Sequence, residues 1–168
     1  HSDWELPEIN NKSWTTLPLT KYLRSTKEIS QHVLKVYGDE YSASAISGLD
    51  PQYIQLKNKG WEEGLDALVQ VLTGLFETEK YHASQVQILI PHSRYLEEVE
   101  QAAYKPNLKV GAIKEVKIES IHKFKGLESE VVVMILPSVE SLESETTIDI
   151  KSLIYVGMSR ATSLLIII

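Results

Sequence analysis

Unbroken apolar runs, Val131–Leu136 and Leu164–Ile168, place the strongest constraint on the fold of this chain. A strand that is apolar at every position needs cover on both faces, which is typical of a parallel sheet with helices on each side. Further strands are predicted at Tyr53–Lys57, at Val86–Ile90 and at Glu115–Glu119. The predicted fold is therefore α/β, a three-layer sandwich with a mainly parallel sheet.

Apolar residues at helical spacing separate these strands. The predicted helices begin near Ser25 and end at Gly38, begin at Trp61 and end near Glu79, begin at a Ser93 cap and end near Ala103, and run from Thr147 to Arg160. Ser25 and Glu28 have the spacing of a capping box, which predicts the first of these helix starts.

Length and composition favour one domain. The 168 residues include no cysteine, which excludes disulfides and thiolate metal sites, and the net charge of -6 argues against binding nucleic acid by bulk attraction. No apolar run reaches the roughly 18 residues of a membrane span and no signal peptide is recognised. The absence of cysteine fits a cytoplasmic protein, which is what we expect. Residues 1–18 are predicted to be an irregular lead-in, and residues 19–168 the domain. The missing initial methionine and the ending within an apolar run predict a fragment of a longer protein.

The polar turn Ser120–Glu128 lies between two predicted strands, where α/β proteins usually hold their chemistry. If the preceding strand continues, Ser120 and His122 share one face and could contact a sugar–phosphate strand. Gly126 allows close approach, and the Glu128 carboxylate could accept hydrogen bonds from ribose hydroxyls. Six lysines and two glutamates between residues 105 and 125 make this region locally basic. A solvated charged face is the alternative explanation for that run.

Two arginines could face a phosphate. Arg24 precedes a predicted helix N-terminus, where backbone N–H groups favour anions, although a single exposed arginine needs no ligand. Arg160 ends the last predicted helix and could act as an arginine finger on a nucleotide held by another domain. Its alternative role is to cap the carbonyls of its own helix. No phosphate loop, dinucleotide fingerprint, metal-binding His pair or nucleophile elbow occurs, so the chain holds no complete catalytic set.

Three segments resemble motifs of one family. Ser-Ile-His-Lys-Phe-Lys-Gly-Leu-Glu at 120–128 resembles motif V of the UvrD/Rep-like superfamily I DNA helicases, Leu-Ile-Tyr-Val-Gly-Met-Ser-Arg-Ala at 153–161 their motif VI, and Leu-Thr-Lys-Tyr-Leu-Arg-Ser-Thr at 19–26 their motif IV. The chain departs from the family at Tyr22-Leu23 and at Lys151-Ser152. The resemblance implies a C-terminal, RecA-like motor domain over residues 19–168, without a phosphate loop of its own.

The resemblance also implies roles for single residues. ATP would lie between this domain and an N-terminal RecA-like domain of the same protein, which would supply the phosphate loop and the Mg²⁺-binding acid. Arg24 and Arg160 would reach the γ-phosphate as catalytic residues, and Glu128 with Gly126 would contact the ribose. Ser120, His122 and Lys125 would bind single-stranded DNA, with 3′ to 5′ translocation. The fragment alone would be inactive as an ATPase.

Other functions stay open at this point. A degenerate helicase-like domain could bind nucleic acid or a protein without catalysis. A helicase-related ATPase could act on RNA or regulate a linked nuclease. A self-contained hydrolase is disfavoured because no nucleophile–base pair is visible in the sequence.

Overall fold

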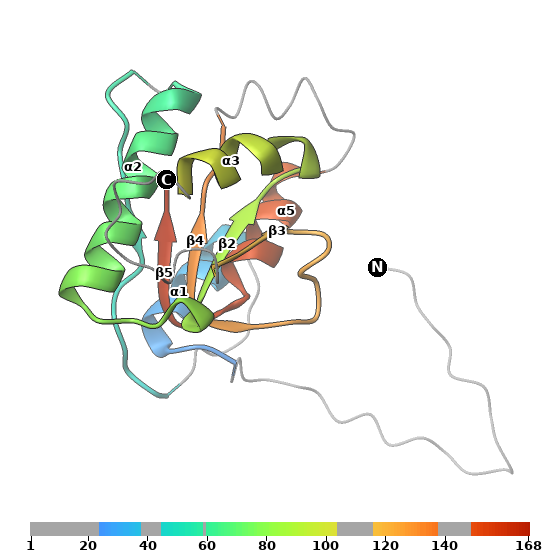
Figure 1. Cartoon of the computed structure of the whole chain (residues 1–168). Helices are drawn as coiled ribbons and strands as arrows, with labels where there is room; N and C mark the ends of the chain where they lie inside the picture. Colours follow the sequence, from blue (N-terminus) through green and yellow to red (C-terminus); the bar gives the residue numbers. More distant parts are fainter. Residues whose placement is uncertain (1–23, 38–44, 59, 104–115, 138–148) are drawn as a thin grey trace, which may run out of the picture.

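Five parallel strands form one sheet in the computed structural model, which describes residues 24–37, 45–58, 60–103, 116–137 and 149–168 (Figure 1). They are β1 (Gln52–Tyr53), β2 (Val86–Ile90), β3 (Lys117–Ser120), β4 (Ser129–Met134) and β5 (Ala161–Ile167), in the order β1-β5-β4-β2-β3. Every neighbouring pair is parallel. The prediction of a mainly parallel sheet is confirmed.

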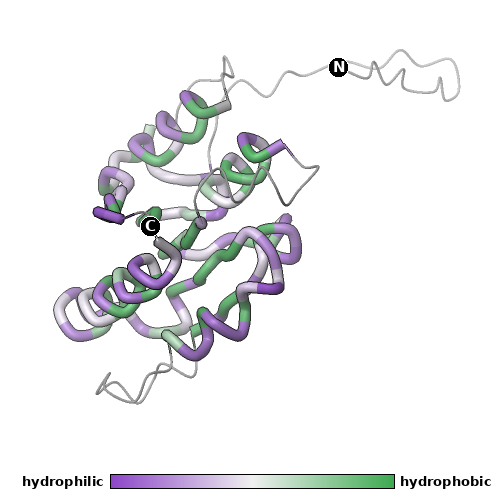
Figure 2. The backbone as a smooth tube through the Cα atoms, turned by 90° about the horizontal axis from the view of Figure 1, so that it is seen from above, coloured by the Kyte–Doolittle hydropathy of each residue, from purple (hydrophilic) through white to green (hydrophobic). Residues whose placement is uncertain are grey.

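Helices cover both faces of the sheet. One face carries α1 (Lys27–Tyr37) and α5 (Ile150–Met158), and the other carries α2 (Trp61–Thr73) and α3 (Leu96–Ala103). A π-helical turn, Gly74–Thr78, continues α2. Short 3₁₀ turns, Ala83–Gln85 and Ser93–Tyr95, precede β2 and α3. Seen from above, hydrophobic strands lie between helical layers whose outer turns are hydrophilic (Figure 2).

The apolar run in β4 serves two cores. Val131 and Val133 pack with residues of α2 and α3, whereas Val132 and Met134 pack with residues of α1 and α5. Successive side chains of a strand point to opposite faces, so a strand between two helical layers must be apolar throughout. This arrangement is the three-layer sandwich that the sequence predicts.

The predicted strand Tyr53–Lys57 is wrong in extent. Only Gln52 and Tyr53 pair with β5 as strand residues. The N–H groups of Lys57 and Asn58 donate instead to the Glu63 carboxylate, at 3.0 and 2.8 Å. The chain therefore leaves the sheet after Tyr53, and its N–H groups bond to a glutamate in the first turn of α2.

Two helix caps also differ from prediction. The Ser25 hydroxyl is buried without a hydrogen-bond partner, and Glu28 accepts the Gly48 N–H at 2.6 Å, a contact that lowers the pKa of its carboxyl group. The helix forms, but the predicted capping box does not. Before α3, His92 Nδ1 accepts the Arg94 N–H at 3.2 Å, so His92 rather than Ser93 is the cap.

Several predictions fall outside the described residues: the lead-in 1–18, most of the motif IV segment at 19–23, the lysines 105, 109 and 114, and the start of the last helix at 147–148. Among the described helices, none is both long and apolar enough to span a bilayer.

Candidate nucleotide-binding edge and nucleic-acid interface

Residues 121–128, which we call the connector, join the end of β3 to the start of β4 and pass over the intervening β2 (orange in Figure 1). Ile121 and Phe124 are buried in the core beside α1 and α5 and anchor it. The Ile121 N–H donates to the Ile90 carbonyl at 2.9 Å. Gly126 has φ +90°, a conformation that favours glycine, and it turns the chain toward β4.

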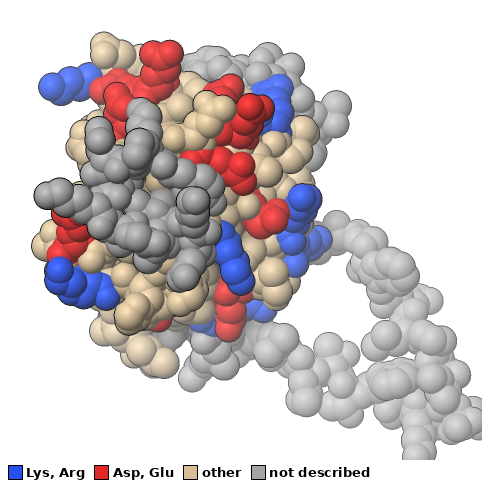
Figure 3. Space-filling view, viewed as in Figure 1, with Lys and Arg blue, Asp and Glu red and all other residues tan. Residues whose placement is uncertain are grey.

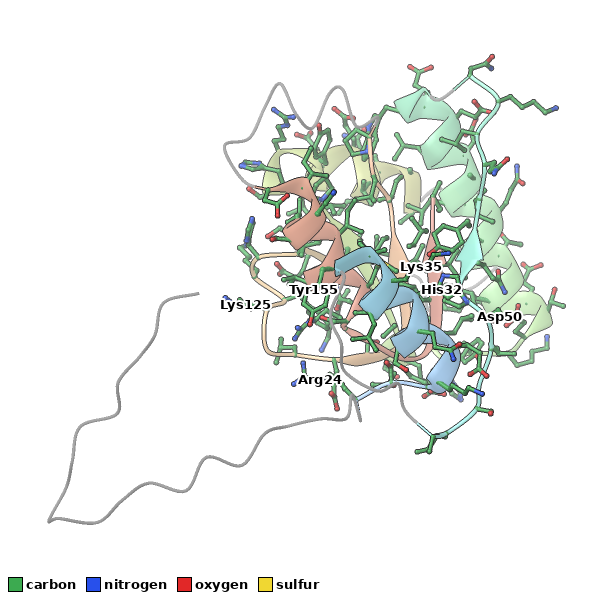
Figure 4. The ribbon with its side chains drawn as sticks, turned by 180° about the vertical axis from the view of Figure 1, so that it is seen from behind. Arg24, His32, Lys35, Asp50, Lys125 and Tyr155 are labelled. Carbon is green, nitrogen blue, oxygen red and sulfur yellow. The ribbon has the colours of Figure 1, made fainter. Side chains whose placement is uncertain are left out.

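The connector ends beside two arginines, at the end of the sheet where β4 and β5 begin. Glu128 Oε2 lies 3.6 Å from Arg24 Nε, and both side chains are about half exposed. Arg160 immediately precedes β5, whose first residue pairs with Ser129 of β4. Three sequence-predicted residues from three separate segments therefore gather at one edge of the sheet. Arg24 lies at this edge in Figure 4, away from His32 and Asp50.

Arg160 is buried, with only 8% of its surface exposed. Its Nε donates to the Val156 carbonyl at 2.9 Å, and its Nη2 donates to Ser159 Oγ at 2.9 Å. Its Nη1 donates to the Leu127 carbonyl of the connector at 3.3 Å. The first contact is the helix-capping role that the sequence left open for this arginine. The third joins motif VI to motif V, and no side-chain pattern could have predicted it, because the acceptor is a main-chain oxygen.

Backbone contacts fix the same edge. The Ser129 N–H donates to the Arg160 carbonyl at 3.0 Å, and the Thr26 N–H donates to the Thr162 carbonyl at 3.2 Å. Between Ser129 and Val131 the pairing of β4 with β5 shifts by one residue, which is a β-bulge directly after Arg160. Bulges re-aim neighbouring side chains and occur often beside functional sites. Main-chain hydrogen bonds thus tie Thr26 of motif IV to the residue that follows Ala161, and Arg160 of motif VI to the residue that follows motif V.

Close packing of α5 sets the position of Arg160. A Cβ atom added at Gly157 would lie 2.6 Å from Met134 Cε and 3.2 Å from Ile121 Cδ1. A residue with a side chain would therefore require the buried ends of Met134 and Ile121, or α5 itself, to shift. The Asp149 carboxylate accepts the Lys151 N–H at 3.1 Å and caps the other end of this helix.

At the other end of the connector, the predicted nucleic-acid contacts are not on one strand face. β3 ends at Ser120, and residues 121–126 form a turn, so the condition that the strand continues to His122 is not met. Ser120 is 7% exposed, and its Oγ accepts the Lys123 N–H at 3.4 Å. The buried Phe124 closes the turn by donating its N–H to the Ser120 carbonyl at 3.1 Å.

His122 and Lys125 are exposed on this turn, and Lys125 extends from the connector in Figure 4. Lys123 Nζ lies 3.7 Å from Glu119 Oε2. On the described part of the face in Figure 3, basic and acidic groups are interspersed. Any contact with a phosphate backbone here would depend on a few local cations, because the net charge of the chain is negative.

Strand register gives the distance between the two ends of the connector. Ser120 pairs with Ile90, one residue beyond the pair Leu89–Met134. Ser120 is therefore level with residue 135, six positions beyond Ser129. At the usual rise of a strand, the two ends of the connector are ~20 Å apart along the strand direction.

Comparisons with known proteins agree with the sequence motifs. The UvrD-like helicase C-terminal domain model matches residues 5–168. The C-terminal domain of a possible DNA helicase from Lactobacillus plantarum WCFS1 is 18% identical, with a TM-score of 0.60, covering 86% of this chain and 85% of that chain.

Two structures of the PRRSV helicase, one of them described as nsp10, are 12% and 13% identical, with TM-scores of 0.45 and 0.44. The matches cover 89% and 88% of this chain and 22% and 23% of those chains, so this chain spans less than a quarter of their length. No curated protein matches the sequence.

The predicted RecA-like α/β fold is confirmed by the five-stranded parallel sheet and by the likeness to the Lactobacillus domain. The family match extends over almost the whole chain, including all three motif segments. This chain belongs to the UvrD-like helicase C-terminal domain family.

Proposed function

We propose that this helicase domain is the second motor half of an ATP-dependent DNA helicase or translocase. It would place Arg24 and Arg160 against an ATP held by a separate N-terminal RecA-like domain. The observation that carries the proposal is the gathering of Arg24, Glu128 and Arg160 at one sheet edge. Membership of the helicase family supports it.

The chemistry of this edge suits a nucleoside triphosphate. Phosphoryl transfer depends mainly on positioning and on neutralising the charge of the transferred group, and guanidinium groups do both. Glu128 lies 3.6 Å from Arg24 and would accept hydrogen bonds from the ribose beside Gly126. The phosphate loop and the Mg²⁺-binding acid belong to the N-terminal domain in this proposal. Hydrolysis then requires the two domains to close on each other.

Single-stranded DNA would bind at the opposite end of the connector. His122 is exposed there and Lys125 is exposed midway along the connector, and both would contact the sugar–phosphate strand. Ser120 would act mainly by holding the turn through its bond with the Lys123 N–H. One rigidly anchored segment therefore joins both sites, so that domain closure around ATP would move the turn relative to the strand.

The test is hydrolysis of ATP by the full-length protein with and without single-stranded DNA. Arg160→Ala should lower kcat by about 10³-fold while nucleotide still binds, because the lost group acts on the transition state. Lys57→Ala is the control, since it removes an exposed cation outside the cluster. Equal rates for the wild type and Arg160→Ala would contradict the assignment of Arg160.

A non-enzymatic binding module is the second candidate, and the inward position of Arg160 favours it. A guanidinium bonded to Val156, Ser159 and Leu127 has a structural role without any nucleotide. This candidate predicts no ATP hydrolysis by the full-length protein with any nucleic acid. It also predicts retained binding of DNA or of a protein.

A further inference from the structure

Arg24 and Arg160 differ in how readily they could meet a phosphate. The Arg24 side chain is 47% exposed, whereas Arg160 is 8% exposed and points its guanidinium at three oxygens of its own domain. Those three oxygens are uncharged. A guanidinium gains more from a phosphate than from neutral acceptors, so the bound state could outcompete this retracted one.

Only the side chain of Arg160 can make the exchange. Its N–H donates to the Gly157 carbonyl at 3.1 Å, and its carbonyl accepts from Ser129 at 3.0 Å. These bonds keep the backbone in place at the start of β5. Extension toward a phosphate therefore breaks the side-chain bonds to Val156, Ser159 and Leu127 and leaves the sheet intact.

Ser159 is built to hold the retracted state. Its side chain is buried, with the residue 2% exposed, and its Oγ donates to the Val156 carbonyl at 2.9 Å. The hydroxyl proton is thereby committed, so a lone pair faces Arg160 Nη2 at 2.9 Å. The Val156 and Leu127 acceptors are main-chain carbonyls, so among these three acceptors Ser159 is the one that a side-chain substitution can remove.

We propose that Ser159 is a positioning residue that keeps Arg160 retracted and so lowers the affinity of the motor for ATP. The inference rests on the proposed function, in which Arg160 meets the γ-phosphate. Apparent affinity for a ligand falls by the fraction of molecules in the competent state, so holding the arginine inward weakens binding. Binding of ATP would also release the Leu127 carbonyl, which removes one contact between the connector and motif VI, while the main-chain bond from Ser129 to Arg160 remains.

Removing the Ser159 hydroxyl should therefore tighten nucleotide binding. In the full-length protein, Ser159→Ala should lower the Kd for a non-hydrolysable ATP analogue with Mg²⁺ about fivefold, the factor one net hydrogen bond makes in an equilibrium. Its kcat should stay within about twofold of wild type, because the extended arginine is unchanged. Ser159→Thr keeps a hydroxyl and should retain the wild-type Kd.

A double-mutant cycle separates this role from general damage to α5. In an Arg160→Ala background, Ser159→Ala should leave the Kd unchanged, because the arginine through which Ser159 acts is missing. If Ser159→Ala fails to tighten binding while Arg160→Ala still abolishes turnover, the positioning role is overturned and the proposed function stands. If Arg160→Ala turns over ATP like wild type, both are overturned.

Discussion

Arg24 and Arg160 bring the same guanidinium group to the same edge of the sheet, in opposite surroundings. Arg24 is a half-exposed cation with an exposed carboxylate, Glu128, 3.6 Å away. Arg160 is buried, and its hydrogen-bond acceptors include the neutral oxygens of Val156, Ser159 and Leu127. A solvent-screened ion pair positions Arg24, whereas burial and hydrogen bonds position Arg160. The motif resemblance gives both arginines the same expected role toward a phosphate. In the structure, Arg160 makes hydrogen bonds within the domain that contribute to the stability of the fold, whereas Arg24 makes an exposed ion pair.

The largest expected effect is on the stability of the chain itself. Arg160→Ala should lower the free energy of unfolding by about 2–4 kcal/mol, because it removes three hydrogen bonds from a buried edge. Arg24→Ala should cost less than about 1 kcal/mol, since exposed ion pairs contribute little. Urea unfolding of both variants measures the difference. Equal losses of unfolding free energy in the two variants would contradict the proposed difference between the two arginines.

The packing beneath Arg160 gives the next effect. Gly157→Ala should destabilise the chain by about 1 kcal/mol, because the new Cβ would lie 2.6 Å from Met134 Cε and 3.2 Å from Ile121 Cδ1, and shifting two buried side chains should outweigh the gain in helix propensity. Gly74→Ala is the matched control, with a helical φ of -59° and no atom within 4 Å of the added Cβ. It should raise stability by up to about 1 kcal/mol. Thermal unfolding that moved both variants in one direction would contradict the close approach of α5.

A comparable effect is expected where the connector turns toward Arg24. Gly126→Ala should cost about 1 kcal/mol through backbone strain at φ +90°, with no steric clash, because nothing lies within 4 Å of the added Cβ. Gly126→Asn should cost less, since asparagine tolerates positive φ better. Chemical unfolding of the two variants would sharpen the picture of a turn limited by conformation. An alanine variant as stable as the parent would refute it.

The smallest effect concerns the Arg24–Glu128 ion pair. Glu128→Gln should change the free energy of unfolding by less than about 1 kcal/mol, and the change should vanish near 1 M salt, where charges are screened within about 3 Å. Glu77→Gln, at an exposed glutamate in the turn after α2, serves as the control. A salt-independent loss at Glu128 would mean that this edge is less solvated than its exposure indicates.

The sequence predicted the parts that depend on side-chain periodicity. Val86–Ile90 is a strand as predicted, and the predicted run Val131–Leu136 overlaps β4 at residues 131–134, because both segments need cover on two faces. Arg24, Glu128 and Arg160 were also predicted from the sequence as candidate site residues, and the structure brings them to one edge of the sheet. Their roles toward ATP and DNA stay predictions.

Main-chain hydrogen bonds account for what the sequence could not predict. The strand at Tyr53 ends early because backbone N–H groups turn to Glu63, and Arg160 turns inward toward the Leu127 carbonyl. Ser120 was expected to face a ligand, but the turn after it uses its hydroxyl. The close approach of α5 to β4 could have been inferred from Gly157, because a glycine within a helix that packs on a sheet often marks such a contact. The motif resemblance included Gly157 without assigning it a packing role.

The pairing of β1 with β5 has a consequence for folding kinetics. Gln52 pairs with Ile166, so a contact that places the edge strand joins residues separated by most of the chain. All strand pairs in this sheet are parallel, and each requires a crossover before its contacts form. High contact order of this kind slows folding, since loop-closure entropy is lost before the pairing is gained. During synthesis β1 must wait for residues 161–167 to emerge, with its apolar neighbours Ile54 and Leu56 lacking their full core until then.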